Sequence, residues 1–163
     1  MKELKVSQEF IIKQKNIFTL PAEYQIYDKN KQVGRIKVDI LEFYNKFYRL
    51  EDWPMLTSTN DICEASSGKK LGSINILIQN FIFPISCGQI LLGSKKYSYC
   101  PCGRFRLDFD IFENESKELV ARYIKKGLFV KRDVVQFGSK IKKDFYPLLI
   151  VLLLLVNLKM HSK

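Results

Sequence analysis

The sequence predicts a mainly β protein whose antiparallel strands close into a barrel around one apolar C-terminal helix. Three observations predict this fold: a hairpin pattern that occurs three times, alternation of apolar and polar residues along several segments, and an unbroken apolar run near the end of the chain. Strands with one apolar face need apolar material to cover, and closing the sheet removes its exposed edges. The apolar helix would supply that material.

The hairpin pattern is a strand, a polar turn and a second strand, which is typical of an antiparallel hairpin. Its three copies cover Tyr24–Asp28 with Val33–Val38, Asp61–Glu64 with Leu71–Ile76, and Phe109–Glu113 with Leu119–Ile124. Gly34, Gly72 and Ala121 occupy equivalent places in the second strands. A small residue there would allow a neighbouring group to approach closely, or would ease a bend of the sheet.

Alternation with a period of two supports the strands. In one segment the apolar positions are Phe105, Leu107, Phe109 and Ile111, set between the charged Arg104, Arg106, Asp108 and Asp110. In another segment Ile36, Val38 and Ile40 alternate with Arg35, Lys37 and Asp39. We therefore expect one face of each segment to be buried and the other to be wet. Further strands and connections are expected in Phe43–Leu50, Phe81–Ile85 and Gly88–Ser94, and because no linker divides the chain we expect one domain, 1–163.

The apolar run is Leu148–Val156, which Pro147 precedes. A helix without a polar face has to be buried on all sides, either in lipid or in protein. Even the wider window Phe145–Leu158 holds only fourteen residues. That is about 21 Å of helix, whereas spanning a bilayer takes about 20 residues. We therefore expect a core helix and no transmembrane span, with a short tail anchor and a buried strand as the alternatives.

The chain is strongly basic. It has 27 Lys and Arg against 17 Asp and Glu, a formal net charge of +10. This charge favours anionic partners such as phospholipid headgroups or nucleic acid, although a basic surface can also serve solubility alone. Seven basic residues concentrate late in the chain and are the candidate anionic-lipid contacts: Lys125, Lys126, Lys131, Arg132, Lys140, Lys142 and Lys143. Nucleic acid is the less favoured partner, because core burial explains the nearby aromatic residues as well as base stacking does.

Catalytic and metal sites find little support. His161 is the only histidine and lies near the end of the chain, so a nucleophile would have no suitable base. Cys100-Pro101-Cys102-Gly103 lacks a second pair of cysteines at the spacing of a zinc site, and its composition suits a turn between strands. We expect no enzyme activity and no cofactor. Four cysteines are too few for a disulfide scaffold and the first residues lack a signal peptide, so we expect a cytoplasmic protein with reduced thiols.

The repeated hairpins, an opening strand Phe10–Lys15 and the leucine-rich helix together resemble the LURP-one-related proteins, which group with tubby C-terminal domains and phospholipid scramblases. The resemblance spans the chain from about Phe10 to about Leu158. It implies a barrel of twelve strands closed around the hydrophobic helix. Tubby-like domains bind phosphoinositides, so the resemblance also implies a lipid partner.

These observations lead to a hypothesis of function and two alternatives. The chain is expected to be a non-catalytic binding or scaffold module of the LURP-one-related type, associated with anionic phospholipid surfaces at the membrane periphery. One alternative is a scramblase-like, membrane-active protein whose C-terminal segment leaves the barrel and inserts in lipid. The other is an enzyme with an unrecognised site in the barrel mouth. The sequence names no protein partner.

Overall fold

The computed structural model describes residues 3–15, 21–51, 59–78, 86–102, 108–126 and 132–161. Within these described ranges, twelve strands, one short 3₁₀ helix and one α-helix follow one another. They are β1 (Val6–Gln14), β2 (Glu23–Asp28), β3 (Lys31–Lys37), β4 (Ile40–Phe43), β5 (Lys46–Leu50), β6 (Thr59–Glu64), β7 (Lys70–Ile78), β8 (Ser86–Leu92), β9 (Lys95–Cys102), β10 (Asp108–Glu113), β11 (Leu119–Lys126), β12 (Arg132–Gly138), η1 (Lys143–Phe145) and α1 (Tyr146–His161).

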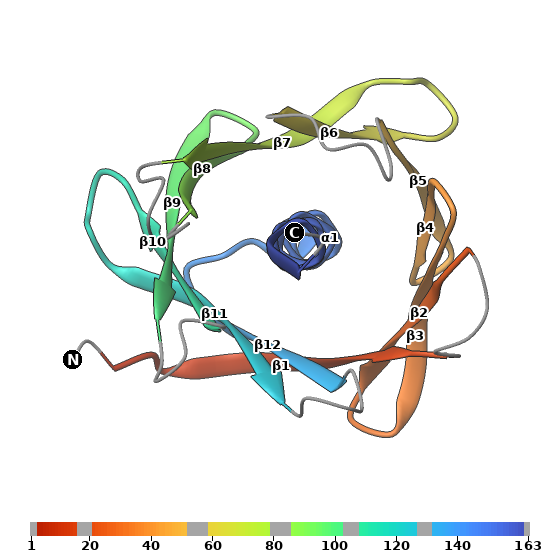
Figure 1. Ribbon diagram of the computed structural model, residues 1–163, viewed down its shortest axis with the longest axis horizontal. Coiled ribbons are helices and arrows are strands. Elements are labelled where there is room, and N and C mark those ends of the chain that lie inside the picture. Colours follow the sequence, from red (N-terminus) through yellow and green to blue (C-terminus); the bar gives the residue numbers. More distant parts are fainter. Residues whose placement is uncertain are drawn as a thin grey trace.

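The strands form one closed antiparallel barrel (Figure 1). Each strand pairs with its neighbours in the sequence, and β1 closes the barrel against β12, with Phe10 opposite Val135. Because every strand has two neighbours, the sheet has no free edge along its length. The predicted fold class, a closed antiparallel barrel of about twelve strands with a C-terminal helix, is confirmed.

Helix α1 lies along the middle of the barrel, as Figure 1 shows. Leu148–Leu154 and Val156 are buried, most of them without any exposed surface. The predicted core helix is therefore confirmed, and Pro147 lies in its first turn, where no N–H is needed. Among the described residues, none of the helices has both the length and the apolar character to cross a bilayer.

Alternate side chains along each strand point inward, toward the helix. The inward aromatic residues form edge-on contacts with each other, for example Phe10 with Phe43 at a centroid distance of 5.5 Å. Tyr146, at the start of α1, stacks on Phe137 of β12 at 4.3 Å. The strand and helix side chains together form one apolar core.

The three predicted hairpins are β2–β3, β6–β7 and β10–β11, and they repeat the same register. Ile26 lies opposite Gly34, Ile62 opposite Gly72, and Ile111 opposite Ala121. In each hairpin a β-bulge follows this pair directly on the side of the turn. The equivalent small residues of the sequence therefore occupy equivalent places in the barrel wall.

Close packing explains the two glycines among these positions. A Cβ atom on Gly34 would lie 2.6 Å from the backbone oxygen of Glu42 and 3.0 Å from the Phe43 ring. A Cβ atom on Gly72 would lie 3.0 Å from the side chain of Leu92 and 3.6 Å from that of Leu148. Gly72 thus lets the neighbouring strand β8 approach closely, whereas the contact with Leu148 would be an ordinary one even for a side chain.

The predicted alternation holds in part. Phe109, Ile111 and Ile36 point into the core as expected, but Val38 and Ile40 are exposed. The prediction that Val38 and Ile40 continue the apolar face of Ile36 is wrong, because β3 ends at Lys37 and the chain turns at Val38, whose φ is 56°. The residues from Arg104 to Leu107 and the segment Phe81–Ile85 lie outside the described residues.

The up-and-down order gives the barrel two distinct ends. Tight turns join β2 to β3, β4 to β5, β6 to β7, β8 to β9 and β10 to β11 at one end, where the chain also leaves β12 for η1 and α1. We call this the turn end. The strands β1, β3, β5, β7, β9 and β11 terminate at the opposite end, toward which α1 runs.

Replacing a helix residue in the core should unfold the protein more readily than the same change on the barrel's outside. We expect Leu152→Asn to lower the free energy of unfolding by about 4 kcal/mol, because it leaves a cavity and a buried amide without partners. The matched control is Leu91→Asn, since Leu91 is 37% exposed on β8, and its cost should stay below about 1 kcal/mol. Urea denaturation followed by circular dichroism measures both, and equal losses would contradict the central position of the helix.

Candidate functional site

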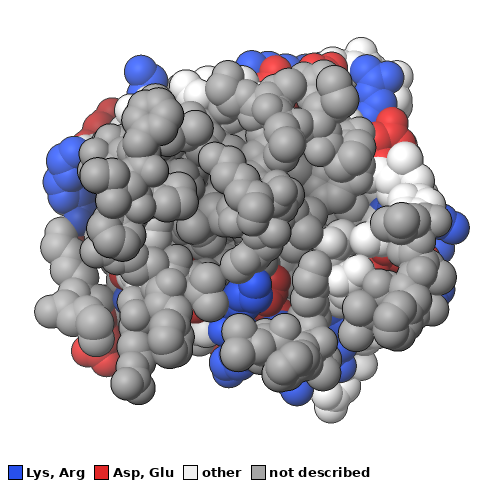
Figure 2. Space-filling view, in the orientation of Figure 1, with Lys and Arg blue, Asp and Glu red and all other residues white. Residues whose placement is uncertain are grey.

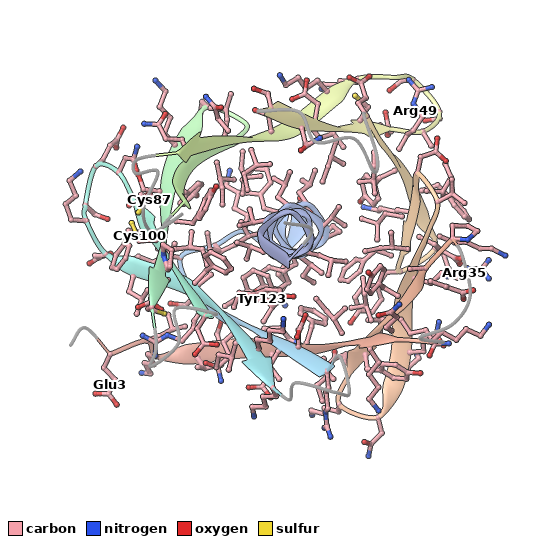
Figure 3. All side chains as sticks on the ribbon, viewed as in Figure 1. Glu3, Arg35, Arg49, Cys87, Cys100 and Tyr123 are labelled. Carbon is pink, nitrogen blue, oxygen red and sulfur yellow. The ribbon has the colours of Figure 1, made fainter. Side chains whose placement is uncertain are left out.

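The turn end of the barrel is lined by lysines. Every tight turn carries at least one, as does the segment that leads into the helix: Lys29, Lys31, Lys46, Lys69, Lys70, Lys95, Lys96, Lys117, Lys140, Lys142 and Lys143, all of them exposed. Six acidic residues lie among them, namely Asp28, Glu64, Glu113, Glu115, Glu118 and Asp144. The end therefore carries an excess of positive charge. Every basic residue among these turns is a lysine, whereas Arg35 and Arg49 point outward from the side of the barrel (Figure 3).

Ion pairs hold some of these lysines in place. Lys95 Nζ lies 2.7 Å from a carboxylate oxygen of Glu113, and Lys140 pairs with Glu118. The hydrogen bond from Lys95 is the main reason that the pKa of Glu113 is lowered, and the same bond raises the pKa of Lys95. Exposed pairs of this kind contribute little to stability. Both lysine side chains are more than half exposed although they are paired.

Two of the turns are built alike and fix their lysines on short, ordered loops. In the β10–β11 turn Ser116 donates to Glu113 at 2.6 Å and accepts from the backbone N–H of Glu118 at 3.3 Å. In the β6–β7 turn Ser67 donates to Glu64 and accepts from the N–H of Lys69 at 3.2 Å. The same Glu and Ser spacing thus closes both turns, and it presents Lys69 and Lys117 at the rim.

The β4–β5 hairpin adds exposed aromatic rings to the turn end. Its two central residues, Tyr44 and Asn45, both have positive φ, which matches the right-handed twist of the strands. Tyr44 is 49% and Phe47 52% exposed. Tyr44 is held by an edge-on contact with the buried Phe43 at 4.8 Å and by a hydrogen bond to Asp28 at 3.1 Å. Lys46 lies between the two rings in the sequence.

Two grooves flank the point at which the chain enters the barrel. The larger, of about 580 Å³, has an apolar floor of Leu71, Phe145 and Leu148 and is bounded by Lys46 and Lys69. The other, of about 410 Å³, also contains Lys46 and adds Lys143 and Tyr146. Each groove therefore combines an apolar floor with lysines at its rim.

The predicted late basic cluster is divided by the fold. Lys126 and Arg132 are exposed at the opposite end, where Lys125 is half-buried. Lys140, Lys142 and Lys143 lie at the turn end, separated from them by the whole of β12, about 20 Å of strand. Lys131 lies outside the described residues. In Figure 2 basic and acidic side chains mix along the margin of the barrel. The seven residues therefore do not form one surface.

The other lysines of the turn end, which lie at the same end as Lys140, Lys142 and Lys143, were not predicted from the sequence as site residues. They are spread over five separate turns, so no local cluster marks them. The signal that could have found them is the repeat itself, since every copy of the hairpin pattern has lysine in or beside its turn.

A buried polar group lies inside the wall at the opposite end. Tyr123, which points into the barrel in Figure 3, donates a hydrogen bond to the carboxylate of Asp133, and both residues are buried. Burial, and then the charge of Asp133, raises the pKa of Tyr24 to about 12. This group belongs to the interior of the fold and presents no open surface for a partner.

The cysteines lie in strands rather than in a turn. Cys100, Pro101 and Cys102 belong to β9 and pair with Asp110, Phe109 and Asp108 of β10. The prediction that these three residues form a hairpin turn is therefore wrong. Pro101 is tolerated because the pairing of β9 with β8 ends at Tyr99, so its missing N–H interrupts no ladder on that side. No group of three or more metal-ligating side chains occurs among the described residues.

Alkaline pH should destabilise the protein through Tyr24. In the unfolded chain this phenol ionises near its ordinary pKa of about 10, whereas in the folded state it stays protonated up to about 12. The contribution of Tyr24 to the free energy of unfolding is therefore complete below pH 10. It is lost as the pH rises to 12, a change on the order of 3 kcal/mol. Tyr24→Phe should flatten the fall of stability over this range, as measured by urea denaturation at a series of pH values. The exposed control variant Leu91→Asn, which removes no titratable group, should keep the wild-type slope, and equal slopes in both variants would contradict the assignment.

Comparisons with known proteins assign no family to the chain. A scan against protein-family models, a search of curated proteins and a search of solved structures each gave no match. The architecture, twelve antiparallel strands closed into a barrel with one C-terminal helix, is consistent with a tubby-like fold.

Proposed function

We propose that the chain is a non-catalytic binding module of the LURP-one-related type that docks on anionic phospholipid surfaces through the turn end of its barrel. The observation that carries the proposal is that the exposed lysines of five turns and the exposed rings of Tyr44 and Phe47 share this end. In this proposal the protein acts in the cytoplasm, at the membrane periphery.

The charges at the turn end suit a lipid surface. Lysines near an anionic membrane contribute about 1 kcal/mol each, so several acting together produce firm binding. Lysine carries a compact, flexible charge without the planar fork with which arginine grips one carboxylate or phosphate. Lysines spread over separate turns are therefore better suited to binding many lipid headgroups at once than to binding a single phosphate.

The β4–β5 hairpin supplies the apolar part of the contact. Aromatic residues are favoured at the boundary between headgroups and acyl chains, where one side of the ring is apolar and the other wet. Phe47 is half exposed in water although it is large and apolar. A lipid interface would cover the rings of Phe47 and Tyr44 while Lys46 reaches the headgroups.

Burial of α1 supports a peripheral mode of binding over the inserting, scramblase-like alternative. The side chains from Leu149 to Leu153 have no exposed surface inside the barrel. Leaving the barrel would expose these side chains and the inner faces of the surrounding strands, at about 25 cal/mol for every Å² of apolar surface. The resemblance to LURP-one-related and tubby-like proteins adds support for a lipid partner, because tubby-like domains bind phosphoinositides.

Removing lysines from the turn end should weaken binding to anionic vesicles. We expect the combined change Lys46→Ala, Lys69→Ala and Lys143→Ala to lower the partition coefficient roughly 100-fold, given about 1 kcal/mol for each lysine. The measurement is co-sedimentation with phosphatidylcholine vesicles that contain phosphatidylserine. Vesicles of phosphatidylcholine alone should bind neither protein.

The matched control removes three exposed positive charges at the opposite end, through Lys37→Ala, Lys126→Ala and Arg132→Ala. It changes the net charge by the same amount, so it should bind nearly as well as the wild type. Equal losses in the two triple variants, or equal binding of the wild type to neutral vesicles, would count against docking through the turn end.

The exposed ring of Phe47 should contribute independently of charge. We expect Phe47→Ser to lower the partition coefficient roughly tenfold, because a buried aromatic side chain stabilises the bound state by about 1.5 kcal/mol or more. The ratio of the two partition coefficients should stay the same as the salt concentration is raised, although salt weakens the binding of both proteins by screening the lysines. Val38→Ser is the control, since Val38 is 45% exposed at the opposite end; a loss of the same size there would exclude a specific role for Phe47.

A further inference from the structure

Two cysteines face each other across neighbouring strands. The ladder between β8 and β9 ends at the pair Gly88 and Tyr99. The next residue on each strand is a cysteine, Cys87 on β8 and Cys100 on β9, so the antiparallel register places them side by side. Both are half-buried free thiols. Figure 3 shows their sulfur atoms together at the wall of the barrel, and they come from adjacent strands.

The spacing of such a pair is compatible with a covalent bond. Residues directly opposite each other in an antiparallel sheet have Cα atoms about 4.5 to 5.5 Å apart. A disulfide spans Cα distances of about 4.4 to 6.8 Å. Cys87 and Cys100 lie one residue beyond the last ladder pair, and the hydrogen bond between their side chains brings the two sulfur atoms into contact, so a bond between them needs little movement of the strands.

The two thiols are not equivalent. The thiol of Cys100 hydrogen-bonds to Cys87, and burial, together with this bond, raises the pKa of Cys100 above its ordinary value. Cys100 is therefore held in its protonated form at neutral pH. A thiol must ionise before it can attack a disulfide, so Cys100 is a poor first nucleophile.

We propose that Cys87 and Cys100 form a reversible redox site that takes low-molecular-weight disulfides such as oxidised glutathione, with Cys87 as the attacking and Cys100 as the resolving thiol. The site is independent of the lysines at the turn end. It ties β8 to β9 at the position where their backbone ladder has ended.

The reaction proceeds in two exchange steps. The Cys87 thiolate attacks one sulfur of the small disulfide, whose S–S bond breaks, and one small thiolate leaves as a Cys87 mixed disulfide forms. Cys100 then loses its proton to water and attacks the Cys87 sulfur, which releases the second small thiolate. The protein dithiol is oxidised by two electrons, and the small disulfide is reduced to two thiols, which take up the two protons.

The other two cysteines have different surroundings and take no part. Cys102 lies opposite Asp108 in the ladder, and burial and the charge of Asp110 raise its pKa to about 12. Cys63 is buried on β6, where its sulfur contacts Glu51 at 3.4 Å. Each of the two therefore provides a matched control for the pair.

The test exposes the reduced, folded full-length chain to oxidised glutathione, blocks the remaining thiols with N-ethylmaleimide and maps the linkages by mass spectrometry of peptides. We expect two of the four thiols to be lost and a linked peptide to join Cys87 to Cys100. Cys102→Ser and Cys63→Ser should give the same linkage. Reduction with dithiothreitol should restore all thiols, and circular dichroism should show the barrel intact throughout.

Single substitutions within the pair test the two roles. Cys100→Ser should accumulate a mixed disulfide of Cys87 with glutathione, because the resolving thiol is gone. Cys87→Ser should react at least about tenfold more slowly, because Cys100 is rarely ionised. Equal rates in the two variants, preferential modification of Cys63 or Cys102, or a wild-type chain without the linkage at saturating oxidised glutathione would overturn the proposal. The linkage map of the wild type needs no variant, so it decides the question even where a substitution impairs folding.

Discussion

The structure depends on the mutual burial of one helix and twelve strands. Helix α1 has no polar face, so it is stable only where apolar side chains surround it on all sides. The barrel in turn is wide enough that the side chains of its own strands would leave its middle empty. Tyr146 at the start of the helix, which stacks on Phe137 of β12 at 4.3 Å, is one of the contacts that join the two. Neither the helix nor the barrel has an apolar partner elsewhere in the described chain.

This filling decides where a partner can bind. In the described part of the chain the side chains of the helix and strands pack together in the interior, where the polar side chains of Tyr24, Tyr123 and Asp133 are buried. The surfaces that the described residues leave open lie on the outer wall and at the ends. At the turn end the loops are short, and hydrogen bonds within them fix the backbone that carries the lysines. Rigid display lowers the conformational entropy that is lost when an extended anionic surface is bound.

The elements that follow from a regular pattern of residues could be predicted from the sequence. The hairpin pattern predicted three hairpins that recur with the same register and the same bulge, and the apolar run predicted the core helix. Two predictions of local structure failed for one reason, which is that composition does not reveal where a strand ends. Val38 has high strand propensity, yet tight pairing of β3 with β4 makes it a turn residue. Cys100-Pro101-Cys102 has the composition of a turn, yet β10 provides a pairing partner for all three residues.

The basic residues show why local clusters mislead in this architecture. In an up-and-down barrel, residues one strand apart in the sequence lie at opposite ends, whereas residues two strands apart return to the same end. Arg132 and Lys140 are close in sequence but face different ends, while Lys46 and Lys95 are distant and share one. Residues that share one end of the barrel therefore recur in the sequence once in every hairpin, that is, every two strands. The same rule accounts for the thiols, because Cys87 and Cys100 are equally far from the turn that joins their strands, and only that symmetry brings them together.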